Sequence, residues 1–256
     1  MKRTSVAIVL LALTLSIAAL GQQAPPMILV YDETVRPDSI AAYEKASKEF
    51  FQILTEQIPE AKWSAVMTDD FHYVYVIPIP SMAAIDGMHK EMEKMVMAVG
   101  PEKFGQIMEA SGKTTDHTDA LVLIRRDDLS YRPATMLKPE ETNVIEYNFY
   151  YLKPGSEFAA EQIAKDYAAL MKKQGIEGSF TTYQLLVGAE MPALVIVVPA
   201  KSALDLAERN AKTEAKLGKE VDALDARALA VTRRFDRKIG RVRPDLADGA
   251  FRKPKP

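Results

Sequence analysis

The stretch IEYNFYYLKPG, residues 145–155, indicates the fold, because it has the pattern of a strand that ends in a turn. β-branched and aromatic residues are typical of strands, and the Pro154-Gly155 pair interrupts one. Ser156 is a natural helix N-cap, and apolar residues then recur every three or four positions from Phe158 to Met171. The stretch therefore predicts a strand followed by a helix with one buried face.

The same pattern occurs near the start of the chain, which indicates an internal repeat. A strand-like run at 27–35 is followed by a turn and by apolar periodicity from Ile40 to Leu54. Each predicted helix is followed by two more strands, a second helix that starts near residue 81 or 200, and a closing strand. These later strands are expected at 62–68, 72–79 and 120–126 in the first copy, and at 179–187, 193–198 and 228–235 in the second.

Each copy therefore reads β-α-β-β-α-β, which is the ferredoxin-like unit of α+β proteins. Such a unit leaves one face of its sheet uncovered, and two tandem copies can cover both faces by closing into one barrel. We predict an intrachain dimeric α+β barrel with its helices outside, whose interior holds side chains or one small ligand. The predicted divisions are a first repeat at 27–126, a linker at 127–142, a second repeat at 143–247 and a flexible tail at 248–256.

The N-terminus has the three-part pattern of a secretory signal peptide. Lys2 and Arg3 precede an apolar run at 6–20, and Ala19 and Gly21 supply the small residues before a cut. This predicts a cleaved signal at 1–21, a leader at 22–26 and a periplasmic or secreted protein. The alternative is an uncleaved anchor helix, although the run is shorter than the roughly 20 residues of a membrane span. No later run is long enough to span.

Composition excludes several classes of function. The chain has no cysteine, which removes thiol nucleophiles, disulfides and cysteine-ligated metals. A net charge of −2 gives no basic surplus for nucleic acid. His72, His89 and His117 have no metal-ligand spacing, so no metal site is predicted. Phosphate-binding glycine loops, GxSxG and HExxH motifs are absent from the sequence, so no motif indicates a cofactor or a catalytic residue.

The 145–155 stretch resembles the opening strand of NIPSNAP-type proteins. Glu146, Tyr150 and Leu152-Lys153-Pro154-Gly155 match that pattern, whereas Asn148 stands where the family has an arginine. The resemblance implies the dimeric α+β barrel group, alongside the antibiotic-biosynthesis monooxygenase-like proteins. That group includes monooxygenases, haem enzymes, isomerases and proteins without an assigned activity, so haem stays open as a cofactor.

Strand alternation places Glu146, Asn148 and Tyr150 on one face, and the resemblance implies that this face points into the barrel. The equivalent face of the first copy carries Tyr31 and Glu33. With His72, at the start of a strand, these residues are the candidate ligand contacts.

The favoured function is an exported protein that binds a small molecule in or near the barrel. Two alternatives stay open. One is a cofactor-free oxygenase or isomerase that uses the barrel interior. The other is a non-catalytic structural or protein-interaction module, with the barrel filled by side chains.

Overall fold

A computed structural model describes residues 27–188 and 190–248. The predicted signal peptide and leader lie outside these residues, as does most of the predicted tail. The first repeat contains β1 (Met27–Val35), the 3-10 turn η1 (Pro37–Ser39), α1 (Ile40–Gln57), β2 (Ser64–Thr68), β3 (His72–Ile79), α2 (Ala84–Val99), α3 (Pro101–Gly112) and β4 (Thr115–Tyr131). The second contains η2 (Pro139–Glu141), β5 (Val144–Leu152), α4 (Glu157–Lys173), β6 (Phe180–Val187), β7 (Ala193–Ala200), α5 (Ala203–Leu217), α6 (Lys219–Val231) and β8 (Thr232–Val242).

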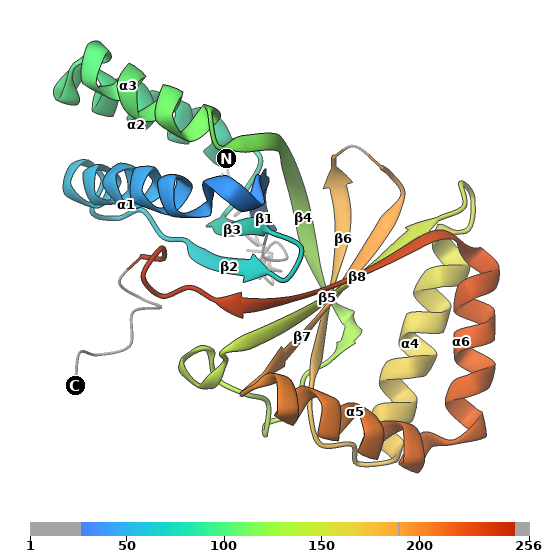
Figure 1. Ribbon diagram of the computed structural model, residues 1–256. Helices are drawn as coiled ribbons and strands as arrows, with labels where there is room; N and C mark the ends of the chain where they lie inside the picture. Colours follow the sequence, from blue (N-terminus) through green and yellow to red (C-terminus); the bar gives the residue numbers. More distant parts are fainter. Residues whose placement is uncertain (1–26, 189, 249–256) are drawn as a thin grey trace, which may run out of the picture.

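The strands close into one barrel in the order β1-β3-β2-β8-β5-β7-β6-β4. Each repeat contributes four neighbouring strands, and β2–β8 and β4–β6 pair antiparallel at the two seams. Figure 1 shows α1, α2 and α3 on one side of the barrel and α4, α5 and α6 on the other. The predicted α+β barrel built from two ferredoxin-like halves is confirmed.

One seam depends on a glycine. Gly240 of β8 pairs with Thr68 of β2. A Cβ at Gly240 would lie 2.5 Å from Cγ1 of Val66 and 3.0 Å from the carbonyl oxygen of Met67. The absence of a side chain at this position therefore lets β8 approach β2 closely enough to close the barrel.

The barrel interior is packed with apolar side chains from strands of both repeats. Its buried core comprises Val30, Val66, Val74, Leu123, Tyr147, Leu185, Ala193 and Val195. A space of about 40 Å³ remains among these strands, bordered by Asp32, Tyr183 and Lys238 and others. That volume holds a few water molecules at most. The described interior therefore offers no room for an organic ligand.

The two faces of β5 point the opposite way from the direction implied by the resemblance. Tyr147 and its alternating neighbours Phe149 and Tyr151 pack inside the barrel. Glu146 and Asn148 point outward, beneath the helices. The aromatic face of β5 fits the interior because it packs there against apolar side chains of other strands, such as Val30 and Leu185.

The region after each hairpin holds two helices where one was predicted. Gly100 and Gly218, both with positive φ (95° and 52°), separate α2 from α3 and α5 from α6. The strand predicted from Ala228 starts only at Thr232, because 228–231 completes α6. A short apolar run of this kind fits a buried helix turn as well as a strand. Within the described ranges, no helix has the length and apolar character needed to cross a membrane.

Candidate functional site

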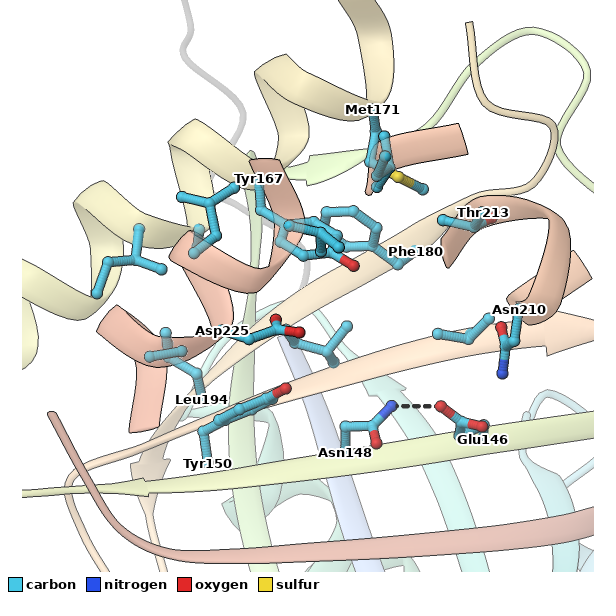
Figure 2. Close-up of a pocket in the computed structure, with 18 of the residues that line it drawn as sticks. Glu146, Asn148, Tyr150, Tyr167, Met171, Phe180, Leu194, Asn210, Thr213 and Asp225 are labelled. Carbon is cyan, nitrogen blue, oxygen red and sulfur yellow. Dashed lines mark hydrogen bonds between the residues drawn. The ribbon is translucent and has the colours of Figure 1, made fainter. Parts of the chain in front are cut away.

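A cavity of about 510 Å³ lies outside the barrel, in the second repeat. Its floor is the outer face of the sheet and its walls are α4, α5 and α6 (Figure 2). Most of the lining is apolar, including Leu152, Ile163, Ala164, Met171, Phe180, Leu194, Ile196, Val198, Leu217, Val221, Leu224 and Phe235.

The corresponding space in the first repeat is filled by three tyrosines. The pair Tyr31–Tyr75 on β1 and β3 corresponds to the pair Asn148–Ile196 on β5 and β7. In the same way, Glu33–Tyr73 corresponds to Tyr150–Leu194. On the first helix of each repeat, the fourth residue is Tyr43 in α1 and Ala160 in α4. The second repeat thus carries alanine, leucine and isoleucine where the first carries tyrosine. The volume of the missing phenol rings accounts for the cavity.

The packed counterpart is held by hydrogen bonds as well as by rings. Tyr43 is fully buried, and its Oη donates a 2.5 Å hydrogen bond to Oε2 of Glu33 and lies 2.9 Å from Oη of Tyr75. Trp63 and Leu246 complete this cluster. Side chains thus occupy the space that corresponds to the cavity.

The polar part of the cavity floor is an ion pair with one amide neighbour. Nδ2 of Asn148 donates a 2.7 Å hydrogen bond to Oε1 of Glu146, and Arg237 of β8 bonds Oε2 of the same carboxylate. The Glu146 side chain is only 8% exposed. Its charge is therefore compensated within the protein before any ligand enters.

The centre of the cavity brings together Asp225 of α6, Tyr150 of β5 and Tyr167 of α4 (Figure 2). Burial raises the pKa of the Asp225 carboxyl, and the nearby charge of Asp222 raises it further. Burial, followed by the charge of Asp225, raises the pKa of Tyr150 to about 12. No described side chain donates a hydrogen bond to Asp225. The group thus combines a solvent-exposed carboxylate, which no described side chain pairs, with two neutral phenols. Such a group can exchange a proton or bind a polar group.

The six sequence-predicted residues fall in three places. Glu146, Asn148 and Tyr150 line the cavity. Glu33 belongs to the packed cluster of the first repeat, where Tyr31 also packs. His72 lies at the barrel mouth, where its Nδ1 is 2.6 Å from Oδ1 of Asp32. Their role in ligand binding stays a prediction.

Sequence reasoning missed Asp225, Tyr167 and Arg237 as cavity residues. Arg237 could have been predicted from the sequence, because it pairs with Asn148 across β8 and β5 and so lies on the same face of the sheet. Tyr167 was visible only as one apolar position of a helix stripe. Asp225 had no signal at all, since a carboxylate on an amphipathic helix is normally solvated.

Haem does not fit this donor set. His72, His89 and His117 all lie outside the cavity lining, so no histidine is placed to bind iron there. The other haem-ligand types in the lining are the phenols Tyr150 and Tyr167 and the thioether of Met171, which in haem proteins accompanies a histidine. Burial raises the pKa of both phenols and so disfavours their phenolate forms. Within the described residues, no cluster of three His, Cys, Asp or Glu side chains is suited to a metal ion.

The sequence matches no protein-family model and no curated protein. Solved structures do resemble it. An anthrone oxidase-like protein is 13% identical, with a TM-score of 0.57 over 87% of this chain and 92% of its own. A proposed monooxygenase from Fusobacterium nucleatum subsp. nucleatum is 10% identical, with a TM-score of 0.51 over 86% and 93%. Chlorite dismutase from Candidatus Nitrospira defluvii, solved with imidazole, is 8% identical, with a TM-score of 0.53 over 90% and 97%.

The chain has the dimeric α+β barrel fold. Each of these neighbours covers most of the chain, so the likeness extends over both repeats. At such low identities it shows the fold alone, because unrelated functions share a fold. The resemblance to NIPSNAP-type proteins stays a prediction.

Proposed function

We propose that the protein binds one small, largely apolar molecule in the cavity between the second half of the sheet and α4, α5 and α6. The observation that carries this proposal is the cavity itself, at about 510 Å³. Ligand sites typically measure about 300–1,000 Å³ and combine apolar walls with a few convergent polar groups. Here those groups are Asn148, Tyr150, Tyr167 and Asp225. The proposed site replaces the barrel interior, which is packed.

A second candidate is an enzyme that uses the same cavity, as a cofactor-free oxygenase or isomerase. The Asp225 carboxyl favours it, since a base with a raised pKa in a cavity is suited to accept a proton from a substrate. The names of two neighbours, an anthrone oxidase-like protein and a proposed monooxygenase, support the same class of reaction.

Export belongs to the proposal through the N-terminal sequence. The basic start, the apolar run at 6–20 and the small residues before Gln22 support cleavage and release. The ligand would then be a molecule met outside the cytoplasm.

The cavity can be tested by filling it with the side chain that fills the first repeat. Ala160→Tyr places a phenol in the cavity of the second repeat, at the position equivalent to Tyr43. Ala159→Tyr adds the same group at an exposed position one residue earlier on α4. We expect the neutral fluorophore N-phenyl-1-naphthylamine to bind the wild type and Ala159→Tyr. Ala160→Tyr should weaken it about tenfold or more.

Circular dichroism must show native secondary structure in both variants. Native mass spectrometry of the purified protein adds a second readout, because a retained molecule should be present in Ala159→Tyr and absent from Ala160→Tyr. Equal binding of the fluorophore by both variants would place the site elsewhere and overturn the proposal.

A further inference from the structure

The charges around the cavity are unbalanced. Five carboxylates line it, and the cations are Arg209 and Arg237. Arg237 pairs with Glu146, while Arg209 donates to the carbonyl of Pro199 at 2.6 Å and lies 3.3 Å from Asp205. The other four carboxylates are Glu177, Glu214, Asp222 and Asp225, which are exposed to solvent and form no ion pair with a described residue.

Asp225 has the most ligand-like position of the four. It is exposed to solvent through the open side of the cavity, and the rings of Tyr150 and Tyr167 lie beside it (Figure 2). Tyr150 in turn packs against Phe235 with ring centroids 4.9 Å apart, and Tyr167 packs against Phe180 at 5.9 Å. Aromatic faces attract cations, and the attraction grows when both partners lose water.

We propose that the ligand is an organic cation, an amine with an apolar body, whose ammonium group lies against Asp225 and the phenols of Tyr150 and Tyr167. This inference rests on the proposed function and specifies its ligand class. An ammonium donates charge-assisted hydrogen bonds to the carboxylate that the protein leaves unpaired. The apolar body covers the aliphatic side chains of β7 and α4, including Leu194 and Ile163.

An anionic ligand is the competing interpretation, because Nε of Arg209 is buried without a partner in the same lining. Three compounds that share one indole ring separate the possibilities: tryptamine is a cation, tryptophol is neutral and indole-3-propionate is an anion. Isothermal titration calorimetry with the purified protein near pH 7 should rank tryptamine about tenfold or more tighter than tryptophol, with indole-3-propionate weakest.

Asp225→Asn then tests the partner. It should weaken tryptamine about tenfold while changing tryptophol less than about twofold, because only the cation loses its counter-charge. Asp166→Asn is the matched control, since Asp166 lies on α4, pairs with Arg227 at 2.8 Å and does not line the cavity. It should leave the ranking unchanged.

Several results would overturn the inference. Equal affinity for tryptamine and tryptophol, a preference for indole-3-propionate, or an unchanged preference in Asp225→Asn each refutes an ammonium site at Asp225. If none of the three indoles binds while N-phenyl-1-naphthylamine still does, the cation inference fails and the cavity proposal stands. Loss of the fluorophore as well would refute both.

Discussion

Tyr43 in α1 and Ala160 in α4 hold equivalent positions in the two repeats, and both pack against the sheet, but only the tyrosine adds a ring and a hydroxyl there. Its Oη donates to Glu33 at 2.5 Å, in a cluster closed by Trp63 and Leu246. Ala160 leaves the space open, and the cavity extends to Tyr150. The two halves thus share a fold but divide their roles: one is a packed support and the other holds a cavity.

Removing the Tyr43 hydroxyl should lower the free energy of unfolding most at pH values where Glu33 is charged. Burial raises the pKa of Glu33, and the hydrogen bond from Tyr43 opposes this. A carboxyl with a raised pKa destabilises the native state as pH rises through that pKa, and loss of the donor enlarges the effect. Tyr43→Phe should therefore cost about 1–3 kcal/mol near pH 7 and less near pH 4.

Urea denaturation at both pH values measures this difference. Tyr31→Phe is the control, because its hydroxyl makes no hydrogen bond to a described residue, and it should change stability by less than about 0.5 kcal/mol. A loss for Tyr43→Phe that is the same at both pH values would show that the lost contact with the Tyr75 hydroxyl, rather than the Glu33 charge, responds.

The sequence predicted the architecture well because its signals were repeated. Strand, turn and helix occur in the same order twice, and a closed barrel is one way to cover the open face of both sheets. The direction of each strand face was harder. On β5 both faces carry tyrosine, at Tyr147 and Tyr150, so alternation defined the two faces without showing which is inside. That choice depends on packing against the other strands.

The cavity itself could not be predicted from local pattern. It results from a difference between repeats at Ala160, Leu194 and Ile196, each of which is an ordinary core residue when read alone. Asp225 lies on a helix that was not predicted as a separate element. A comparison of the two repeats position by position, using Tyr43, Tyr73 and Tyr75 as the reference, is the signal that would have indicated the site.

Gly240 should be intolerant of even one methyl group. The added Cβ of Gly240→Ala would lie 3.0 Å from the backbone oxygen of Met67, which cannot move without disturbing the β2–β8 seam. We expect a loss of about 1–3 kcal/mol in thermal or chemical unfolding. Gly105→Ala is the control, since beyond its chain neighbours and the nearby backbone of α3 no atom lies within 4 Å of its added Cβ. It should stabilise by about 0.5–1 kcal/mol. Equal stability of the two variants would contradict a tight seam.

Arg243, in the segment after β8, links the second repeat to the first through a hydrogen bond to Glu44 of α1. Its side chain hydrogen-bonds Glu44 at 2.5 Å and Asp245 at 2.9 Å. The bonds to Arg243 lower the pKa of both carboxyls. A lowered pKa contributes stability that is present above the unfolded pKa and lost as pH falls.

Arg243→Gln should therefore cost about 1–2 kcal/mol near pH 7, a value reduced by solvent around Asp245, and progressively less between about pH 5 and pH 2. Denaturation curves across that range measure it. A deficit that does not shrink in acid would assign the effect to packing of the arginine stem instead of its charge.

Export should be visible in the mass of the mature chain. Expressed in a Gram-negative host, the protein is expected in the periplasmic extract with Gln22 as its first residue, because cleavage follows Gly21. Leu13→Arg interrupts the apolar run and should retain the precursor, whereas Leu13→Ile should not. Recovery of the intact chain from the membrane fraction would favour the uncleaved anchor.

Asp225→Asn should make the empty protein more stable, although it removes a proposed ligand contact. The raised pKa of Asp225 means that its ionised form is disfavoured in the native state. The penalty is absent below the ordinary carboxyl pKa and complete above the raised one, so the variant should gain stability near pH 7 and match the wild type near pH 3. The gain should stay below about 1 kcal/mol, because water in the open cavity screens the charge. Thermal unfolding measures this gain.

Tryptamine should stabilise the wild type more than Asp225→Asn, since it supplies the counter-charge that Asp225 lacks. A variant less stable than the wild type near pH 7 would mean that Asp225 is already satisfied within the fold.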